Sequence, residues 1–468
     1  MADPRTVSGF TPATKEMTFP IVVDKSKGVY LYDLNGNEYI DFTCGYGSNF
    51  LGHGSDLVSN AVNDQLTKDF SIGPQTPLAG EVAKLFCDMT GNDRVAFSNT
   101  GSEAVLGCTR LARTLTGKQK TVMFNGDYHG ILDEVIVRGN KSLKSFPAAT
   151  GIPRGHVDNT LILEYGDDSA LDIIQDNLDD LAGIVLEPVQ SRRPDLQPQE
   201  FLNKLREMTE NIDTALIFDK VITGFRIAPG GAQQHFGIRA DLAAYGKVVG
   251  GGMPIGLIGG RAEYMDGFDG GFWQYGDNSR PEAGMTYFAG TFVRHPLTLS
   301  VSKAMLEMIK SEGQPMYDRL NGLADNLANQ MNAMFDEIGA PVFMANFGSL
   351  LKVQFTQDVP YSELIFAKLR LKGFFVWDHR PCLMNIQHTQ QHVDSFVQAF
   401  REVLIELQRT GFVPCENSEI ASIAPKFDPD VQPCEGAKLG RDRNGNPGWF
   451  ISDATNPGQF IQVSQSAN

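Results

Sequence analysis

The chain has 468 residues, of which 42% are hydrophobic and 21% charged, and its formal net charge is −16. This composition is typical of a folded globular protein with room for two or three domains, and it excludes a largely disordered chain. The acidic balance disfavours nucleic acid or an anionic membrane as a bulk partner. The start of the chain lacks the features of a signal peptide, no stretch approaches about 18 apolar residues, and the six cysteines form no paired motif, so we expect reduced thiols and a cytoplasmic location.

The first predicted element is a hairpin within an N-terminal segment, residues 1–60. Alternating apolar and polar positions flank Asn35-Gly36, a dipeptide favoured in tight two-residue turns. From residue 61 to 300, short apolar runs alternate with spacers long enough to form helices. This alternation predicts a large α/β domain with a mostly parallel sheet covered by helices on both faces. The predicted strands are 94–97, 121–124, 183–187, 215–219 and 255–259.

Residues 301–410 predict a smaller α+β domain. A long amphipathic segment with helical spacing of its apolar residues precedes two strand-like runs, 349–355 and 374–377. The last stretch, 411–468, is rich in Pro, Gly, Asn, Asp and Ser and lacks the periodicity of a core element. We interpret it as a linker or a tail that docks on a partner.

Lys247 is the most informative single residue. It ends the apolar run 241–247 and is followed closely by Gly250-Gly251-Gly252. A lysine placed where a strand opens into glycine-rich chain can hold its amine in a crowded, water-poor site. That arrangement suits an amine that forms a Schiff base with a carbonyl compound.

Two acids also end predicted strands, where ligands collect in an open parallel sheet. Asp219 precedes Lys247 by 28 residues, which leaves room for a helical crossover to the neighbouring strand. Its carboxylate could pair with a protonated ring nitrogen, or it could only cap the following turn. Glu187 could orient a substrate or the lysine, and a capping role is equally compatible with its position.

Small polar residues at a helix start form a candidate phosphate site. Asn99, Thr100, Gly101 and Ser102 follow the strand 94–97 and precede an apolar helical pattern, so their backbone N–H groups could bind a phosphate monoester. The alternative is a capping box completed by Glu103. Thr291, beside Gly290, is a further, weaker phosphate contact.

Tyr128 and His129 lie in the turn after strand 121–124. An aromatic ring there could stack on a planar cofactor, whereas most such pairs are plain surface residues.

The sequence argues against metal and hydrolase sites. His388 and His392 are four residues apart but lack the His-Glu-x-x-His pattern, so we expect two surface histidines and no metal. Lys247 lacks the glycine arrangement of a nucleotide-binding Walker loop, and no Gly-x-Ser-x-Gly elbow occurs.

Taken together in their order along the chain, these segments resemble the class III aminotransferases of pyridoxal-phosphate (PLP) fold type I, and glutamate-1-semialdehyde aminomutase in particular. The resemblance covers roughly residues 20 to 410. The segments that carry it are 99–104, 128–130, 187–190, 217–219, 223–226, 246–252 and 290–292.

The resemblance implies a role for each matched residue. Lys247 would bind PLP covalently, and Asp219 would pair with its pyridine nitrogen. Tyr128 would stack on one face of the ring and Val221 on the other. Gly101 and Ser102 would bind the phosphate, joined by Thr291 from the second subunit of a homodimer with shared active sites.

The segments 284–296, 379–383 and 436–450 further resemble aminotransferase domains of hybrid polyketide/nonribosomal peptide synthases of microcystin type. This resemblance implies transfer of an amino group from glutamate, glutamine or alanine to a β-keto acyl thioester on a carrier protein, with neighbouring synthase domains as partners. An alternative is an aminomutase that acts on a small amino-aldehyde.

One residue departs from the family pattern. Lys220 stands where the family usually has an acid, between Asp219 and Val221. If its charge points toward Asp219, it would disfavour a protonated ring nitrogen and weaken catalysis; if it points away, little changes. A catalytically impaired PLP-binding scaffold is therefore a third interpretation.

Overall fold

The computed structural model describes residues 20–68, 71–140, 142–415, 432, 436–441, 447–452 and 460–463. A seven-stranded sheet lies at its centre, with the strand order β4-β12-β11-β10-β9-β5-β8. Neighbouring strands are parallel from β11 to β8, whereas β12 runs antiparallel to both β11 and β4. The predicted α/β fold class with a mostly parallel sheet is confirmed. The strands are β4 (Arg94–Ser98), β5 (Lys120–Phe124), β8 (Thr160–Leu163), β9 (Leu181–Leu186), β10 (Ala215–Asp219), β11 (Leu242–Gly246) and β12 (Gly256–Gly260).

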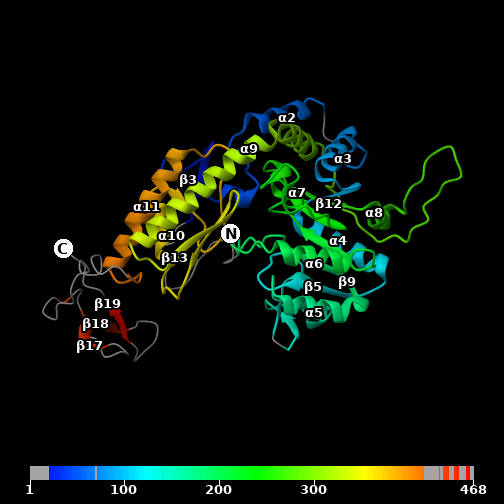
Figure 1. Cartoon of the computed structure of the whole chain (residues 1–468). Helices are drawn as coiled ribbons and strands as arrows, with labels where there is room; N and C mark the ends of the chain where they lie inside the picture. Colours follow the sequence, from blue (N-terminus) through cyan, green and yellow to red (C-terminus); the bar gives the residue numbers. More distant parts are fainter. Residues whose placement is uncertain are drawn as a thin grey trace.

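Helices cover both faces of this sheet (Figure 1). Alternate residues of a strand point to opposite faces, and β10 shows the division. Ala215 and Ile217 pack in one hydrophobic cluster with α4, whereas Leu216 and Phe218 belong to a second cluster with α3, α6 and α7. The covering helices are α3 (Pro77–Thr90), α4 (Gly101–Thr116), α5 (Asp168–Asn177), α6 (Gln199–Thr209) and α7 (Gly231–Phe236).

Helix α9 (Pro296–Glu337) joins the central sheet region to a smaller α+β region (Figure 1). It is kinked at Gly313, whose backbone angles are φ 58° and ψ −153°. Its contacts include α2 (Asp56–Leu66) and α3 as well as β13 (Val342–Phe347) and α11 (Gln390–Arg409). The sequence boundary at residue 300 stays a prediction, since this helix contacts both regions.

The smaller region contains two sheets, with orders β1-β2-β3-β15 and β13-β14-β16. The predicted hairpin is confirmed, because β2 and β3 pair antiparallel around a turn with Gly36 at φ 82°. Strand β3 also pairs in parallel with β15, through Ile40 and Phe374, so the N-terminal segment is built into this region. The elements are β1 (Val23–Lys27), β2 (Tyr30–Asp33), β3 (Glu38–Asp41), β13 (Val342–Phe347), β14 (Leu350–Phe355), α10 (Glu363–Leu371), β15 (Phe374–Phe375), β16 (Cys382–Leu383) and α11 (Gln390–Arg409).

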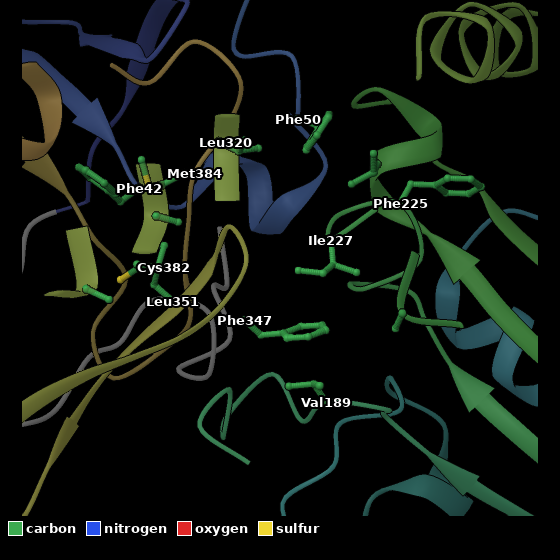
Figure 2. Close-up of a cluster of buried hydrophobic side chains, with 14 of the residues drawn as sticks. Phe42, Phe50, Val189, Phe225, Ile227, Leu320, Phe347, Leu351, Cys382 and Met384 are labelled. Atoms are coloured by element: carbon green, nitrogen blue, oxygen red, sulfur yellow. The ribbon is translucent and has the colours of Figure 1, made fainter. Parts of the chain in front are cut away.

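A continuous hydrophobic cluster connects the two regions. Figure 2 shows Phe42 and Phe50 of the N-terminal segment, Phe225 and Ile227 beyond β10, and Leu351 of β14 among its buried members. Burial of these large side chains fixes the regions against each other, because each contributes about 1.5–3 kcal/mol when removed from water.

One expectation needs correction. His388 is not a surface residue: it is 1% exposed, and burial followed by the nearby His392 lowers its pKa to about 3. In the last stretch, β17 (Lys438–Arg441), β18 (Pro447–Ser452) and β19 (Phe460–Val463) form an antiparallel sheet, and its role as a linker or docking tail stays a prediction. Most other residues of 411–468 lie outside the described residues, as do residues 1–19 of the N-terminal segment.

The segment between α8 (Ala262–Asp269) and α9 projects away from the rest of the chain (Figure 1). It exposes several large apolar side chains, and Thr291 lies near its end. The exposed residues are Phe272, Trp273, Tyr275, Met285, Tyr287 and Phe292. A short two-stranded sheet, β6 (Val137–Gly139) with β7 (Ser145–Pro147), lies beside β8.

Within the described residues, no helix is both long and apolar enough to cross a bilayer. In the described part of the chain, Cys44, Cys87, Cys108 and Cys382 are free thiols.

Candidate active site

Lys247 lies directly after β11, at the carboxyl end of the central sheet. Its backbone is in the left-handed region, with φ 48°, a conformation that is costly for a residue with a side chain. Burial lowers the pKa of its amine, although Asp219 and Glu187 act in the opposite direction. An amine with a lowered pKa is deprotonated in a larger fraction of molecules at neutral pH, which is the form that attacks a carbonyl carbon.

Asp219 ends β10, the strand that pairs in parallel with β11. The predicted neighbouring positions of Asp219 and Lys247 are therefore confirmed. The Asp219 side chain is 6% exposed, and its Oδ1 accepts a hydrogen bond from the N–H of Val221. Its Oδ2 lies 2.9 Å from Nδ1 of His129, so a buried carboxylate and a buried imidazole form a pair.

His129 is held from both sides. Its Nε2 lies 3.2 Å from Oδ2 of Asp127, a residue that the sequence analysis did not assign. Burial alone would lower the pKa of His129, but the hydrogen bonds to Asp127 and Asp219 outweigh burial and raise the pKa to about 10. Gln190 fixes Asp127 in turn, because its Nε2 donates to Oδ1 of Asp127 at 2.9 Å. The imidazolium thus places a positive charge beside Asp219.

Glu187 follows β9 and accepts two backbone hydrogen bonds. The N–H of Tyr128 donates to Oε1 at 2.9 Å, and the N–H of Ser191 donates to Oε2 at 3.1 Å. Burial, then the negative charges of Asp127 and Asp219, raise its pKa to about 8. Glu187 therefore joins the turn after β5 to the turn after β9, and its protonation state changes near neutral pH.

The start of α4 bears on both interpretations of this segment, a capping box and a phosphate site. Thr100 is the N-cap and its side chain accepts from the N–H of Glu103, while the N–H of Asn99 donates to the Glu103 carboxylate at 2.6 Å. Glu103 thus completes a capping arrangement, although its carboxylate accepts from Asn99, the residue before the N-cap, and not from Thr100 itself. Because Glu103 occupies the N–H of Asn99 and Thr100 that of Glu103, the N–H groups of Gly101 and Ser102 are the ones left at the helix start for an anion.

Close packing leaves little free space around the start of α4. A Cβ on Gly101 would lie 2.8 Å from both methyl groups of Val221, and a Cβ on Gly246 would lie 3.4 Å from one of them. Val221 therefore lies against the residue before Lys247 and against the helix start. Gly130 faces Ser102, whose Oγ accepts from the N–H of Ile131 at 3.2 Å. These contacts bring the predicted segments 99–104, 128–130 and 246–252 together with Val221.

Tyr128 and Thr291 are both exposed. The Tyr128 side chain is 47% exposed and available to cover a ligand. Gly290 lies close to the Asn99 side chain of the same chain, which places Thr291 near the start of α4. Whether Tyr128 stacks on a ring and whether Thr291 serves the other subunit stay predictions.

Lys220 points away from Asp219. Successive residues of β10 alternate between faces, and Lys220 follows the face of Leu216 and Phe218. Its Nζ lies 3.1 Å from Oε1 of Gln233 and 4.4 Å from the centre of the Tyr245 ring. Burial lowers its pKa well below the usual value. Of the two orientations considered for Lys220, the structure shows the one that leaves Asp219 undisturbed.

The profile of the family described as aminotransferase class-III matches residues 11–404. The chain belongs to the class III aminotransferases. A curated relative, glutamate-1-semialdehyde 2,1-aminomutase from Methanococcus maripaludis, is 36% identical over 412 residues, which cover 83% of this chain and 92% of the relative. The corresponding enzyme from Ruminiclostridium cellulolyticum is 32% identical over 406 residues, covering 83% and 91%.

Solved structures support the same family and fold. An ω-transaminase from Sphaerobacter thermophilus superposes with a TM-score of 0.76 at 27% identity, covering 86% of this chain and 93% of that one. A β-phenylalanine aminotransferase from Variovorax paradoxus gives a TM-score of 0.73 at 26% identity, covering 89% and 92%. The class III aminotransferase fold is PLP fold type I, and this chain is a PLP-dependent enzyme.

The residues at the carboxyl end of the sheet fit this cofactor. A buried acid, an amine with a lowered pKa and a helix start with two available N–H groups are the chemical partners of a pyridine nitrogen, an aldehyde and a phosphate. Sequence reasoning missed Asp127 and Gln190. The signal was present, because both lie in the same turns as the predicted residues His129 and Glu187.

Proposed function

We propose that Lys247, Asp219 and Glu187 are the catalytic residues of a PLP-dependent amino-group transfer. The observation that carries the proposal is the position of the Lys247 amine, with its lowered pKa, directly after β11, the strand that pairs with the strand of Asp219. When bound, pyridoxal phosphate supplies an aldehyde that takes up an amino group and a ring that absorbs negative charge.

The surrounding residues would hold and orient the cofactor. Asp219, supported by the His129 imidazolium, would hold a proton on the pyridine nitrogen. The N–H groups of Gly101 and Ser102 would bind the phosphate, with Asn99 and Thr100 shaping the helix start. Tyr128 and Val221 would lie on opposite faces of the ring. Thr291 would add a phosphate contact from the partner subunit.

Lys247 would also move a proton at the substrate α-carbon, since its amine is free once an amino substrate is bound. Glu187 lies on the same side of the sheet and would orient Lys247 or the substrate through its charge. Because its pKa is about 8, that charge depends on pH in the range where the enzyme would work.

Two substrate classes are candidates. The curated relatives are named glutamate-1-semialdehyde 2,1-aminomutase, which favours an intramolecular transfer on a small amino-aldehyde. The resemblance of 284–296 and 379–383 to synthase domains favours transfer from glutamate, glutamine or alanine to a β-keto acyl thioester on a carrier protein. The geometry at Lys247 serves both reactions, because each begins with the same proton transfer.

A homodimer is part of the proposal. The projecting segment exposes Trp273, Tyr275 and Tyr287, a group of aromatic side chains typical of a buried interface core. We expect it to pack on a second copy of this chain and to bring Thr291 to the partner's active site.

A donor experiment separates the two substrate classes. Holoenzyme is mixed with glutamate, glutamine or alanine, and the release of the matching keto acid is measured together with the cofactor spectrum. Stoichiometric keto acid supports intermolecular transamination. Conversion of an amino-aldehyde with no keto acid supports the aminomutase.

A further inference from the structure

Arg226 ends the segment 223–226, to which the proposed function gives no role. It lies in the loop after β10, and its side chain is only 1% exposed. Arginine is almost never fully buried unless an acid pairs with it. Among the residues that the structure describes, however, no ion pair includes Arg226. A buried guanidinium without a carboxylate is costly, so we looked for what its charge and its hydrogen bonds do.

The guanidinium joins three separate segments. Nη2 donates to the carbonyl oxygen of Gly47, in the N-terminal segment, at 2.6 Å. Nη1 donates to Oγ of Ser349 at 3.1 Å and to the carbonyl oxygen of Met384 at 3.0 Å. Ser349 directly precedes β14, and Met384 directly follows β16. Arg226 therefore fixes the N-terminal segment and the smaller region to the loop after β10.

The turn that Arg226 binds has a strained backbone. All four residues of Cys44–Gly47 have positive φ, between 48° and 95°. Two of the four carry side chains, for which left-handed backbone is costly, so the turn needs contacts that hold it. Asp41 holds its start, because its Oδ2 accepts from the N–H of Cys44 at 3.1 Å. The hydrogen bond from Arg226 to Gly47 holds its end.

The end of this turn lies against Lys247. A Cβ on Gly47 would lie 3.4 Å from Nη2 of Arg226 and 3.6 Å from Cδ of Lys247. The guanidinium and the lysine side chain therefore approach the same face of Gly47. The turn also contacts the segment Lys247–Gly250. Any shift of the turn 44–47 thus moves atoms that pack on the Lys247 side chain.

Arg226 also acts on Lys247 through its charge. Burial lowers the pKa of the Lys247 amine most, Asp219 and Glu187 raise it, and the positive charge of Arg226 lowers it again. The two acids favour the protonated amine, so the guanidinium opposes them and favours the neutral form.

Arg226 keeps its charge at neutral pH. Burial lowers its pKa to about 10, whereas Cys44 and Tyr317 raise it. The Cys44 thiol is itself neutral, because burial and then Asp41 hold its pKa well above the usual value. The guanidinium lies 5.5 Å from the centre of the Phe50 ring, whose face attracts a cation.

We propose that Arg226 is a positioning residue for Lys247, which holds the turn 44–47 against the lysine side chain and keeps a positive charge near its amine. The inference rests on the proposed function and adds a residue to it. Arg226 would act only through Lys247: its hydrogen bonds keep the side chain in place, and its charge increases the fraction of neutral amine that can attack a carbonyl carbon.

The charge is tested in the full chain freed of cofactor, where Lys247 carries a plain amine. Labelling of the lysines with acetic anhydride at a series of pH values, followed by mass spectrometry of the peptides, gives the pKa of this amine. Arg226→Gln removes the charge and keeps a hydrogen-bond donor, so we expect the pKa of Lys247 to rise by about one unit. Arg226→Lys keeps the charge and should keep the pKa near its wild-type value.

The control for the charge is Arg319→Gln. Arg319 is an exposed arginine that also donates to a backbone carbonyl oxygen, that of Ile386, at 3.3 Å. This variant should keep the wild-type pKa of Lys247. Equal Lys247 pKa values in Arg226→Gln and wild type overturn the proposal.

The position is tested in holoenzyme with Gly47→Ala, which leaves Arg226 in place. Its Cβ would press on the side chains of Arg226 and Lys247. We expect the donor half-reaction to slow about tenfold at saturating donor, with little change in the half-saturating concentration. The matched control is Gly117→Ala, because Gly117 also has positive φ, 69°, but open space around it. The control should keep the wild-type rate, and an equal rate for Gly47→Ala contradicts the proposal.

Failure of this inference and failure of the proposed function can be told apart. If borohydride reduction of holoenzyme links no cofactor to Lys247, the proposed function fails. The labelling experiment does not depend on that result. A raised Lys247 pKa in Arg226→Gln still supports the effect of Arg226 on the lysine, and an unchanged pKa overturns it.

Discussion

Nδ1 of His129 lies 2.9 Å from Oδ2 of Asp219, although the two residues are separated by 90 positions in the chain. Asp127 binds the other ring nitrogen, so two buried carboxylates share one imidazolium. This arrangement keeps a negative charge at the end of β10 without leaving it unpaired in the protein interior.

We expect His129→Asn to slow the donor half-reaction ten- to about a hundredfold. The variant loses a hydrogen bond between charged groups, which contributes about 1.5–3 kcal/mol. Single-turnover kinetics at neutral pH measure the effect. His156→Asn, a change at an exposed histidine, should keep the wild-type rate. Equal rates for the His129 variant and wild type would show that the pair does not support the reaction.

The same pair predicts a loss of stability in alkali. The pKa of His129 is raised from about 6.5 in an unfolded chain to about 10 in the folded protein. Its stabilising contribution is therefore complete below about pH 6.5 and is lost as the pH rises through 10. Urea unfolding of wild type and His129→Asn should show a difference that shrinks between these pH values. A difference that grows with pH would contradict the assignment.

Lys220→Met should stabilise the protein by about 1–3 kcal/mol at neutral pH. Removal of a buried amine whose contacts are the Gln233 amide oxygen and the Tyr245 ring, and not a carboxylate, relieves its desolvation, and Gln233 Oε1 keeps the N–H of Ala240 as a donor. Because the folded pKa lies below the unfolded value of about 10.4, the gain should be largest at low pH and vanish above pH 10.4.

Turnover of the Lys220→Met variant should stay within about twofold of wild type, since the side chain lies on the face opposite Asp219. Lys204→Met, a change at an exposed lysine, should leave stability nearly unchanged. A large gain in turnover for Lys220→Met or Lys220→Glu would instead support an impaired natural form.

Gly101→Ala should weaken cofactor binding, because its Cβ would lie 2.8 Å from both Val221 methyl groups. Overpacking of this kind costs about 1–3 kcal/mol. The double variant Gly101→Ala with Val221→Ala should recover part of the affinity. Gly80→Ala, at a helical glycine with open space around it, should not weaken binding. Equilibrium binding of PLP measures all three. If the Gly101→Ala variant bound PLP with unchanged affinity, the start of α4 would not be part of the cofactor site.

Much of the site could be predicted, because its residues lie at the ends of strands and these strands appear in the sequence as apolar runs. Lys247, Asp219 and Glu187 all follow or end such runs, and a parallel sheet brings these ends together. The antiparallel direction of β12 could not be predicted, because the apolar pattern of Gly256–Gly260 indicates a buried strand but not the direction in which it runs. Strand β8 (Thr160–Leu163) was not among the predicted strands, although it too is a short apolar run.

The contacts of buried polar residues also could not be predicted from the sequence. The orientation of Lys220 depends on its register in β10 and on Gln233, thirteen residues away. His388 is buried, and the ring of Phe42 packs against it. The two residues lie far apart in the chain. Neither partner can be identified from local sequence, since charged and polar residues are usually exposed.

The central claim is that the Lys247 amine binds the cofactor covalently. Borohydride reduction of the yellow holoenzyme, followed by proteolysis and mass spectrometry of the peptides, tests it directly. We predict a stable pyridoxyl adduct on Lys247 and none in the Lys247→Ala variant. An adduct on another lysine, or a cofactor that is released unreduced, would contradict the account.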